Sequence, residues 1–138
     1  MVVGTRGFTL IELLVVLAIL ALLAGLVGPA VMNALGESKG KAARVQIEDL
    51  GAALDLYRLD VGRYPNSEEG LVALVTKPAS AKRWNGPYLK KRTIPDDPWG
   101  NPYHYTSPGE HGGYDLLSLG ADSSPGGEGD NRDILSWE

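Results

Sequence analysis

The sequence contains no cysteine, only two histidines and no excess of basic residues. Without cysteine, the chain has no disulfide framework, no thiolate zinc site and no cysteine nucleophile. Its 13 Lys and Arg against 17 Asp and Glu give a net charge of −4. That charge argues against non-specific nucleic-acid binding, which needs a basic face. The 138 residues allow one domain of ordinary size, and 18 glycines and 9 prolines predict much turn and loop.

The motifs of common catalytic sites are also missing. His104 and His111 do not have the spacing of paired zinc ligands. The chain has neither a phosphate-binding glycine loop nor a Gly-x-Ser-x-Gly elbow around a nucleophilic serine. A membrane-anchored, metal-dependent hydrolase is therefore the weaker interpretation, and we expect a protein that is not an enzyme.

A long hydrophobic run lies near the start of the sequence. Residues 13–32 carry no charge and no hydrogen-bonding side chain. As a helix they would span about 30 Å, the thickness of a bilayer core. A buried core helix and a secretory signal are the alternatives, but the run is apolar all round and longer than the hydrophobic core of a signal peptide. Arg6 ahead of the run predicts a cytoplasmic N-terminus and an exported remainder.

Four residues within or beside this run stand out. Glu12 lies at its edge, and a carboxylate near hydrocarbon is costly unless paired, so Glu12 is a candidate functional residue. The alternative is a carboxylate that merely sits at headgroup level. Gly25, Gly28 and Pro29 weaken the helix, because proline removes a backbone hydrogen bond and glycine is a poor helix former. Their simplest predicted effect is a kink.

Beyond Gly36 the pattern becomes that of an amphipathic helix. Apolar residues recur at spacings of three and four along one face: Ala43, Ile47, Leu50, Leu54, Tyr57 and Val61. We expect one long, bent helix over residues 8–61, with its second half packed on a globular partner. A coiled-coil dimer is the weaker alternative.

The rest of the chain predicts that partner. A short helix is expected over residues 67–74, with Ser67 as its N-cap. Strands are expected over residues 102–106, 114–119 and 134–137. The fold class is therefore α+β: a long N-terminal helix packed on a small antiparallel sheet. Four aromatic side chains beside Gly and Pro are expected to anchor loops by burial, with a sugar-binding platform as the alternative: Trp84, Tyr88, Trp99 and Tyr103.

The residues around the start of the hydrophobic run carry a family resemblance. Residues 6–12, Arg-Gly-Phe-Thr-Leu-Ile-Glu, resemble the class III signal of type IV pilins and type II secretion pseudopilins. The resemblance implies a prepilin peptidase that cuts after Gly7 and methylates the new amine of Phe8. It also implies that Glu12 pairs with the N-terminal amine of a neighbouring subunit. Residues 25–29 would become extended when the subunit leaves the membrane for a filament.

Later segments narrow the resemblance to the major pseudopilins of type II secretion, the general secretion pathway protein G family of the type IV pilin-like superfamily. The segments are Gly-Arg-Tyr-Pro at 62–65, Glu-Gly-Leu at 69–71, Gly-Pro-Tyr-Leu at 86–89, Asp-Pro-Trp-Gly-Asn-Pro-Tyr at 97–103 and Leu-Gly-Ala-Asp at 119–122. The resemblance implies a leader peptide at 1–7, a hydrophobic transmembrane and filament-core helix at 8–35, and a periplasmic globular domain at 36–138.

The same resemblance implies a structural subunit of a secretion filament. The subunit would cross the inner membrane once and then polymerise into a periplasmic filament that drives folded proteins across the outer membrane. Its partners would be copies of itself, minor pseudopilins, the prepilin peptidase, an inner-membrane assembly platform and the secreted substrates. The alternative is the major subunit of a related type IV pilus or DNA-uptake filament.

The C-terminal loop, residues 119–134, is acidic and rich in glycine. Four carboxylates lie in it: Asp122, Glu128, Asp130 and Asp133. Such oxygen ligands suit calcium, although the spacing is not that of an EF-hand and a solvated acidic loop is the alternative. The resemblance implies a structural Ca²⁺ held by the Leu119 carbonyl, Asp122 and Asp133, with Asp130 as a further acidic ligand. In a chain without cysteine, that ion would be the main cross-link of the loop.

Overall fold

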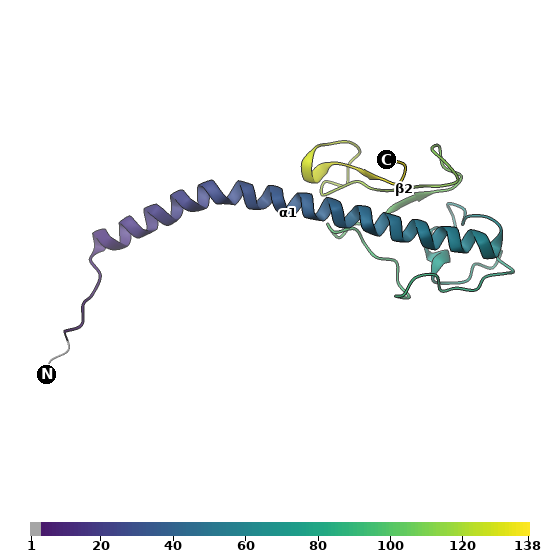
Figure 1. The fold of residues 1–138 in the computed structure, drawn as a ribbon, viewed down its shortest axis with the longest axis horizontal. Helices are drawn as coiled ribbons and strands as arrows, with labels where there is room; N and C mark the ends of the chain where they lie inside the picture. Colours follow the sequence, from purple (N-terminus) through teal and green to yellow (C-terminus); the bar gives the residue numbers. More distant parts are fainter. Residues whose placement is uncertain (1–3) are drawn as a thin grey trace. The chain divides into compact units, whose positions relative to one another are not determined.

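The computed structural model describes residues 4–138 and contains one long helix and a small antiparallel sheet (Figure 1). Helix α1 is Leu10–Val61, 3-10 helix η1 is Leu71–Leu74, and 3-10 helix η2 is Gly129–Asn131. The strands are β1 His104–Thr106, β2 Asp115–Ser118 and β3 Ile134–Leu135. The α+β class predicted from the sequence is confirmed. The chain divides into two compact units, with the boundary between Leu35 and Gly36.

The N-terminal unit contains the apolar half of α1. Every residue from 4 to 27 is exposed, and this stretch is long and apolar enough to cross a membrane. The helix is unbroken through Gly25, Gly28 and Pro29. The sequence predicts a kink here, and hydrogen bonding along the helix continues through it in the isolated chain. Proline removes only one backbone hydrogen bond, and the helix continues on both sides of it.

In the C-terminal unit, α1 buries the apolar stripe that its spacing predicts. Five of the six stripe residues are buried: Ala43, Ile47, Leu50, Leu54 and Tyr57. Val61 is partly buried and packs against the same core. A large apolar side chain that is fully buried, such as Leu54, contributes about 1.5–3 kcal/mol to stability. This stripe is therefore the main attachment of α1 to the rest of the unit.

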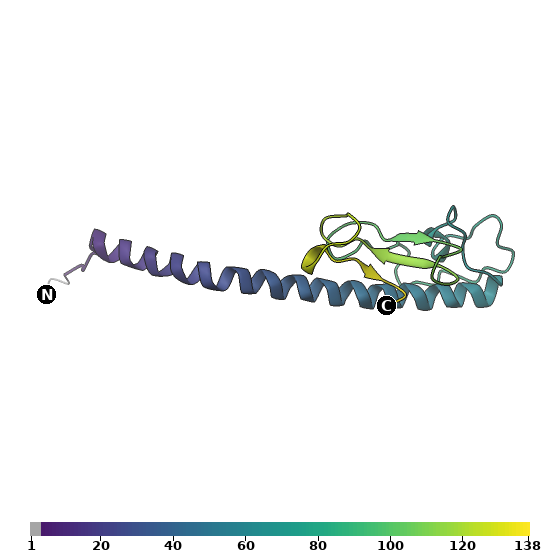
Figure 2. The same cartoon turned by 90° about the horizontal axis from the view of Figure 1, so that it is seen from above.

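The sheet has the order β1-β2-β3, and both strand pairs are antiparallel. Tyr105 faces Leu116 in the first pair, and Ser118 faces Ile134 in the second. Figure 2 shows the three strands lying alongside the second half of α1. The three strands are shorter than predicted. Pro102 lacks a backbone donor, and the left-handed backbone of Gly120 (φ 71°) ends the pairing after β2.

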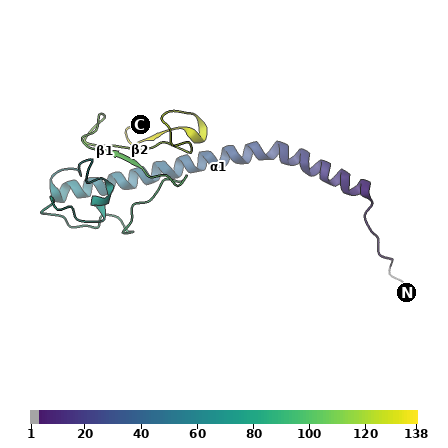
Figure 3. The ribbon, with the colours of Figure 1, turned by 180° about the vertical axis from the view of Figure 1, so that it is seen from behind.

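Residues 62–100 form irregular loops that lie on a different side of α1 from the sheet (Figures 1 and 3). The helix predicted over 67–74 is present only in its second half. Only Leu71–Leu74 is helical, as the 3-10 helix η1, after a turn that ends at Gly70 with φ 60°. Ser67 is not its cap, because its hydroxyl donates to the Ser107 carbonyl at 3.1 Å and accepts from the Ser107 N–H at 2.9 Å.

Candidate functional site: the N-terminal segment and the C-terminal loop

The predicted cleavage point lies in the segment just before α1. Residues 4–9 are exposed and have no helical or strand hydrogen bonding, and Phe8 is 90% exposed. Residues 1–3 of the predicted leader lie outside the described residues. The helix was predicted to start at residue 8, but it starts at Leu10. The peptide bond between Gly7 and Phe8 is therefore outside the helix.

Two side-chain contacts explain this starting point. The Thr9 N–H donates to Oε2 of Glu12 at 3.0 Å, and the Glu12 N–H donates to Oγ1 of Thr9 at 3.3 Å. This reciprocal arrangement is a capping box, in which each side chain satisfies a backbone donor that the helix leaves free. Glu12 was singled out in the sequence, whereas Thr9 was not. The Thr-x-x-Glu spacing was the signal that could have found it.

The C-terminal loop does not bring its predicted calcium ligands into one cluster. Within residues 4–138 there is no group of three or more acidic or histidine side chains placed to hold a metal ion. Oδ1 of Asp122 accepts from the N–H of Ser124 at 3.1 Å, which makes a local turn. The carboxylate of Asp130 lies against Gly36 on α1, where an added Cβ would meet its Oδ1 at 1.7 Å.

Asp133 is the predicted side-chain ligand with a buried oxygen that no donor among residues 4–138 satisfies. Its Oδ2 accepts from the N–H of Gly126 at 2.9 Å, but its Oδ1 is buried and has no hydrogen-bond partner. A buried carboxylate oxygen without a donor is costly, and a cation is one of the groups that can satisfy it. Leu119, whose carbonyl was the other predicted inner ligand, is partly buried at the end of β2.

A buried polar chain holds the base of this loop. Ser118 Oγ donates to Oδ2 of Asp97 at 2.6 Å and accepts from the Gly120 N–H at 3.2 Å. The other oxygen of Asp97, Oδ1, accepts from the N–H groups of Trp99 and Asn101 at 3.1 and 2.9 Å. Asp97 therefore joins the 97–101 turn to the start of the acidic loop. The sequence did not single out Asp97 or Ser118, because their pairing is tertiary and spans 21 residues.

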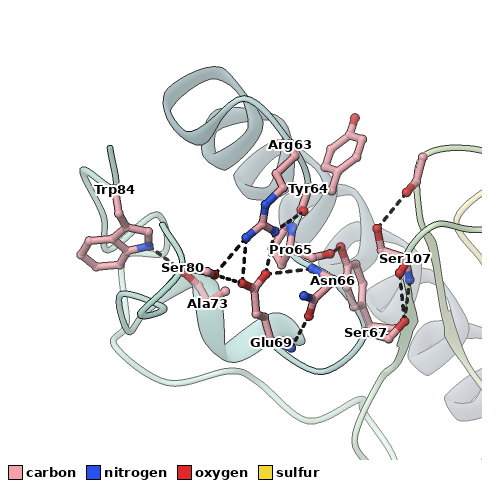
Figure 4. Close-up of polar contacts among 12 residues, drawn as sticks. Arg63, Tyr64, Pro65, Asn66, Ser67, Glu69, Ala73, Ser80, Trp84 and Ser107 are labelled. Atoms are coloured by element: carbon pink, nitrogen blue, oxygen red, sulfur yellow. Dashed lines mark hydrogen bonds and ion pairs between the residues drawn. The ribbon is translucent and has the colours of Figure 1, made fainter. Parts of the chain in front are cut away.

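A second network fastens the turn after α1 (Figure 4). The Arg63 guanidinium makes two hydrogen bonds of 2.8 Å to the Glu69 carboxylate, and Ser80 Oγ donates to that carboxylate. Asn66 completes it, since its N–H donates to Glu69 Oε2 at 2.9 Å and its side chain accepts from the Glu69 N–H at 2.8 Å. These hydrogen bonds, with that of Arg63 foremost, lower the pKa of Glu69 to about 2.

The predicted aromatic anchors do pack into the loops. Trp84 Nε1 donates to the carbonyl of Ala73 at 2.7 Å, and the Tyr88 hydroxyl donates to Oδ2 of Asp60 at 2.8 Å. Trp84 and Tyr88 also meet edge to face, with ring centroids 5.7 Å apart. Trp99 is partly buried and Tyr103 is buried, so none of the four rings lies open as a flat platform for a sugar.

Comparisons with known proteins agree along almost the whole chain. Residues 30–137 match the family model described as Type II secretion system (T2SS), protein G, and residues 4–28 match the Prokaryotic N-terminal methylation motif. The chain is 49% identical to the type II secretion system core protein G of Pseudomonas aeruginosa, over 96% of this chain and 94% of that protein. It is 45% identical to the core protein G of Vibrio cholerae, over 95% of this chain and 90% of that protein.

A solved structure also resembles the fold. It is the crystal structure of the major pseudopilin from the type 2 secretion system of enterohaemorrhagic Escherichia coli. The TM-score is 0.67 at 34% sequence identity, over 77% of this chain and 88% of that one.

Proposed function

The chain belongs to the type II secretion system protein G family, and we propose that it works, as a structural subunit of the pseudopilus, by polymerising through α1. The observation that carries this proposal is the uncovered apolar half of the helix. Every residue from 4 to 27 is exposed, so this rod needs lipid or other protein around it. A type IV pilus or DNA-uptake role is not favoured, because the family model and the solved relative both belong to type II secretion.

Processing comes before assembly in this proposal. A prepilin peptidase would cut after Gly7, remove residues 1–7 and methylate the amine of Phe8. The match of residues 4–28 to the N-terminal methylation motif supports both steps. The precursor would cross the inner membrane once, with Arg6 on the cytoplasmic side and residues 36–138 in the periplasm.

Glu12 would supply the charge that selects partners during assembly. The new Phe8 amine is cationic and lies at the edge of the apolar segment. A carboxylate and an amine from different subunits neutralise each other there, and removing one partner of a buried pair costs about 3–5 kcal/mol. The exposed position of Glu12 on α1 leaves its carboxylate accessible to a neighbouring subunit.

Residues 25–29 would extend when the subunit enters the filament. Two features support this proposal: Gly25 and Gly28 are poor helix formers, and Pro29 has no N–H to donate. Gly28 is partly buried and the other four residues of this stretch are exposed, so backbone hydrogen bonds are its main support. Hydrogen exchange on assembled filaments tests the proposal, because protection of residues 25–29 equal to that of the flanking turns would contradict it.

The filament would act as a moving scaffold rather than a catalyst. Energy would come from a separate cytoplasmic ATPase, because the sequence has no phosphate-binding glycine loop. Partners would be further copies of the chain, minor pseudopilins, the inner-membrane assembly platform and the folded proteins that are exported.

We propose that the C-terminal loop binds one structural Ca²⁺. The unpartnered, buried Oδ1 of Asp133 is the feature of the fold that fits a cation. The Leu119 carbonyl, Asp122 and Asp130 would be the further ligands, all within the same acidic loop. The bound ion would supply a charge that holds these oxygens together and fixes the loop to the sheet.

Two measurements test the proposed function. Deleting the gene should stop protein secretion but leave twitching motility and transformation intact. Loss of motility or transformation with normal secretion would instead assign the chain to a pilus. Intact mass of the membrane-extracted protein should show loss of residues 1–7 together with a gain of about 14 Da from one methyl group.

A further inference from the structure

The start of α1 is set by a side chain that competes with the backbone. In an α-helix each N–H donates to the carbonyl four residues earlier, so a helix reaching further back would need the Glu12 N–H to bond the Phe8 carbonyl. In the structure the Glu12 N–H donates instead to Oγ1 of Thr9. The next N–H, that of Leu13, makes the opening backbone bond, to the Thr9 carbonyl at 3.2 Å. Thr9 thus occupies the donor that would extend the helix toward the predicted cleavage point.

Glu12 blocks the same extension from the other side. Its Oε2 accepts from the Thr9 N–H, which a longer helix would need for a carbonyl upstream. With both donors taken by side chains, Gly7 stays outside the helix, and an added Cβ there would meet no atom of residues 4–138 within 4 Å. Helical hydrogen bonding would engage the carbonyl of Gly7, whereas within residues 4–138 no backbone N–H donates to it here.

We propose that Thr9 and Glu12 are positioning residues for cleavage: their capping box fixes the helix start at Leu10 and holds the Gly7–Phe8 peptide bond outside the helix and accessible to the peptidase. The inference rests on the proposed processing after Gly7. That step is a hydrolysis, in which water adds across the Gly7–Phe8 amide to give a carboxyl on Gly7 and an amine on Phe8. The match to the N-terminal methylation motif over residues 4–28 places the cleavage point and the box in one recognised segment.

Two roles of Glu12 can be tested separately. The capping box needs its side-chain oxygen, whereas the proposed assembly step needs its negative charge. Gln at the third helical position also completes a capping box, because its side-chain oxygen can accept from the same N–H. Glu12→Gln therefore keeps the helix start but removes the negative charge that the proposed assembly step needs. Thr9→Ala removes the hydroxyl and places a strong helix former at the position before the first helical residue, so the helix can extend toward Gly7.

The test measures the initial rate at which a purified prepilin peptidase cleaves the full-length precursor in detergent micelles. Thr9→Ala should slow cleavage about fivefold, the change expected when one N-cap is lost. Thr9→Asn, a good N-cap of different shape, and Glu12→Gln should both remain within about twofold of wild type. Amide hydrogen exchange on the same samples should show protection moving upstream toward residue 8 only in Thr9→Ala.

Three results would count against these expectations. Wild-type cleavage of Thr9→Ala, despite a shifted helix start, would overturn the inference. A Thr9→Asn precursor as slow as Thr9→Ala would also overturn it, since Thr9 would then act through direct contact with the peptidase. A wild-type precursor that is never cut after Gly7 would overturn the proposed processing itself, which distinguishes that failure from the other two.

Discussion

The two halves of α1 differ in how far their side chains are buried. The half in the N-terminal unit is apolar on every face, and no residue from 4 to 35 is buried. The half in the C-terminal unit is apolar along one stripe, and that stripe is buried, with Leu54 and Tyr57 at 0% exposure. The C-terminal half finds the partner for its apolar stripe within the chain, whereas the N-terminal half requires lipid or protein from outside the chain. A continuous helix can therefore serve two environments if its hydrophobic pattern changes along its length.

The largest expected effect concerns the half that requires outside partners. Glu12→Ala should leave the protein inserted and cleaved at steady state but abolish filament assembly, because the Phe8 amine of a neighbour would lose its partner. Filament yield by sedimentation or electron microscopy measures this. Wild-type yield from Glu12→Ala would contradict the proposed pairing, and Leu20→Ala, which keeps the charge, is the matched control.

Shortening a core side chain in the C-terminal half of α1 should lower the stability of the fold rather than impair assembly. Leu54 is fully buried and Leu56, two residues away, is 51% exposed. Leu54→Ala should lower the unfolding free energy by about 2–5 kcal/mol, since it leaves a cavity in the core. Leu56→Ala should stay within about 0.5 kcal/mol of wild type. Urea unfolding in detergent, followed by near-UV circular dichroism, measures both, and equal losses would contradict the one-sided burial of this half.

Calcium removal should destabilise the C-terminal unit alone. At a Ca²⁺ concentration about 100-fold above the dissociation constant, binding adds about 2.7 kcal/mol to stability, which excess EGTA should remove. The melting temperature and protease resistance of residues 36–138 should fall, and Asp133→Asn should lose the response to EGTA. An unchanged melting curve of the wild type in excess EGTA would reject the proposed site.

The smallest expected effect is a pH dependence from the turn that follows α1. Arg63 lowers the pKa of Glu69 from 4.5 to about 2, so this ion pair stabilises the fold above pH 4.5 and is lost as the pH falls toward 2. Because Arg63 is partly exposed, we expect only about 1–2 kcal/mol after solvent screening. Unfolding of wild type and Glu69→Gln, compared across this pH range, measures it. If the difference in unfolding free energy between wild type and Glu69→Gln did not change with pH, the Arg63–Glu69 pair would not be the cause of the pH dependence.

The sequence predicted the features that depend on periodicity or on one local motif. The buried stripe of α1 follows from spacings of three and four, and the three strands lie where β-forming residues are bounded by turns. The family resemblance from the Gly7 to Glu12 segment and the later motifs is also confirmed.

Two kinds of feature were missed: side-chain caps marked by a local spacing, and tertiary contacts. The sequence predicts Ser67 as a cap, but the Asn-x-x-Glu spacing marks Asn66, whose N–H and side chain bond to Glu69 three residues later. The Asp97–Ser118 hydrogen bond joins distant segments, so no local pattern marks it. The predicted calcium ligands remain a prediction, because within residues 4–138 the structure does not gather them into one group.

The short strands at the two edges of the sheet limit aggregation between copies of the chain that lie close together. An edge strand exposes free N–H and C=O groups on which another chain can build a further strand, and this is a common route to aggregation. Here β1 has three residues and β3 has two, so each edge offers little backbone to such a template. Copies held side by side at high local concentration are thereby discouraged from merging their sheets. The proposed assembly through helices is protected in this way from an irreversible assembly of strands.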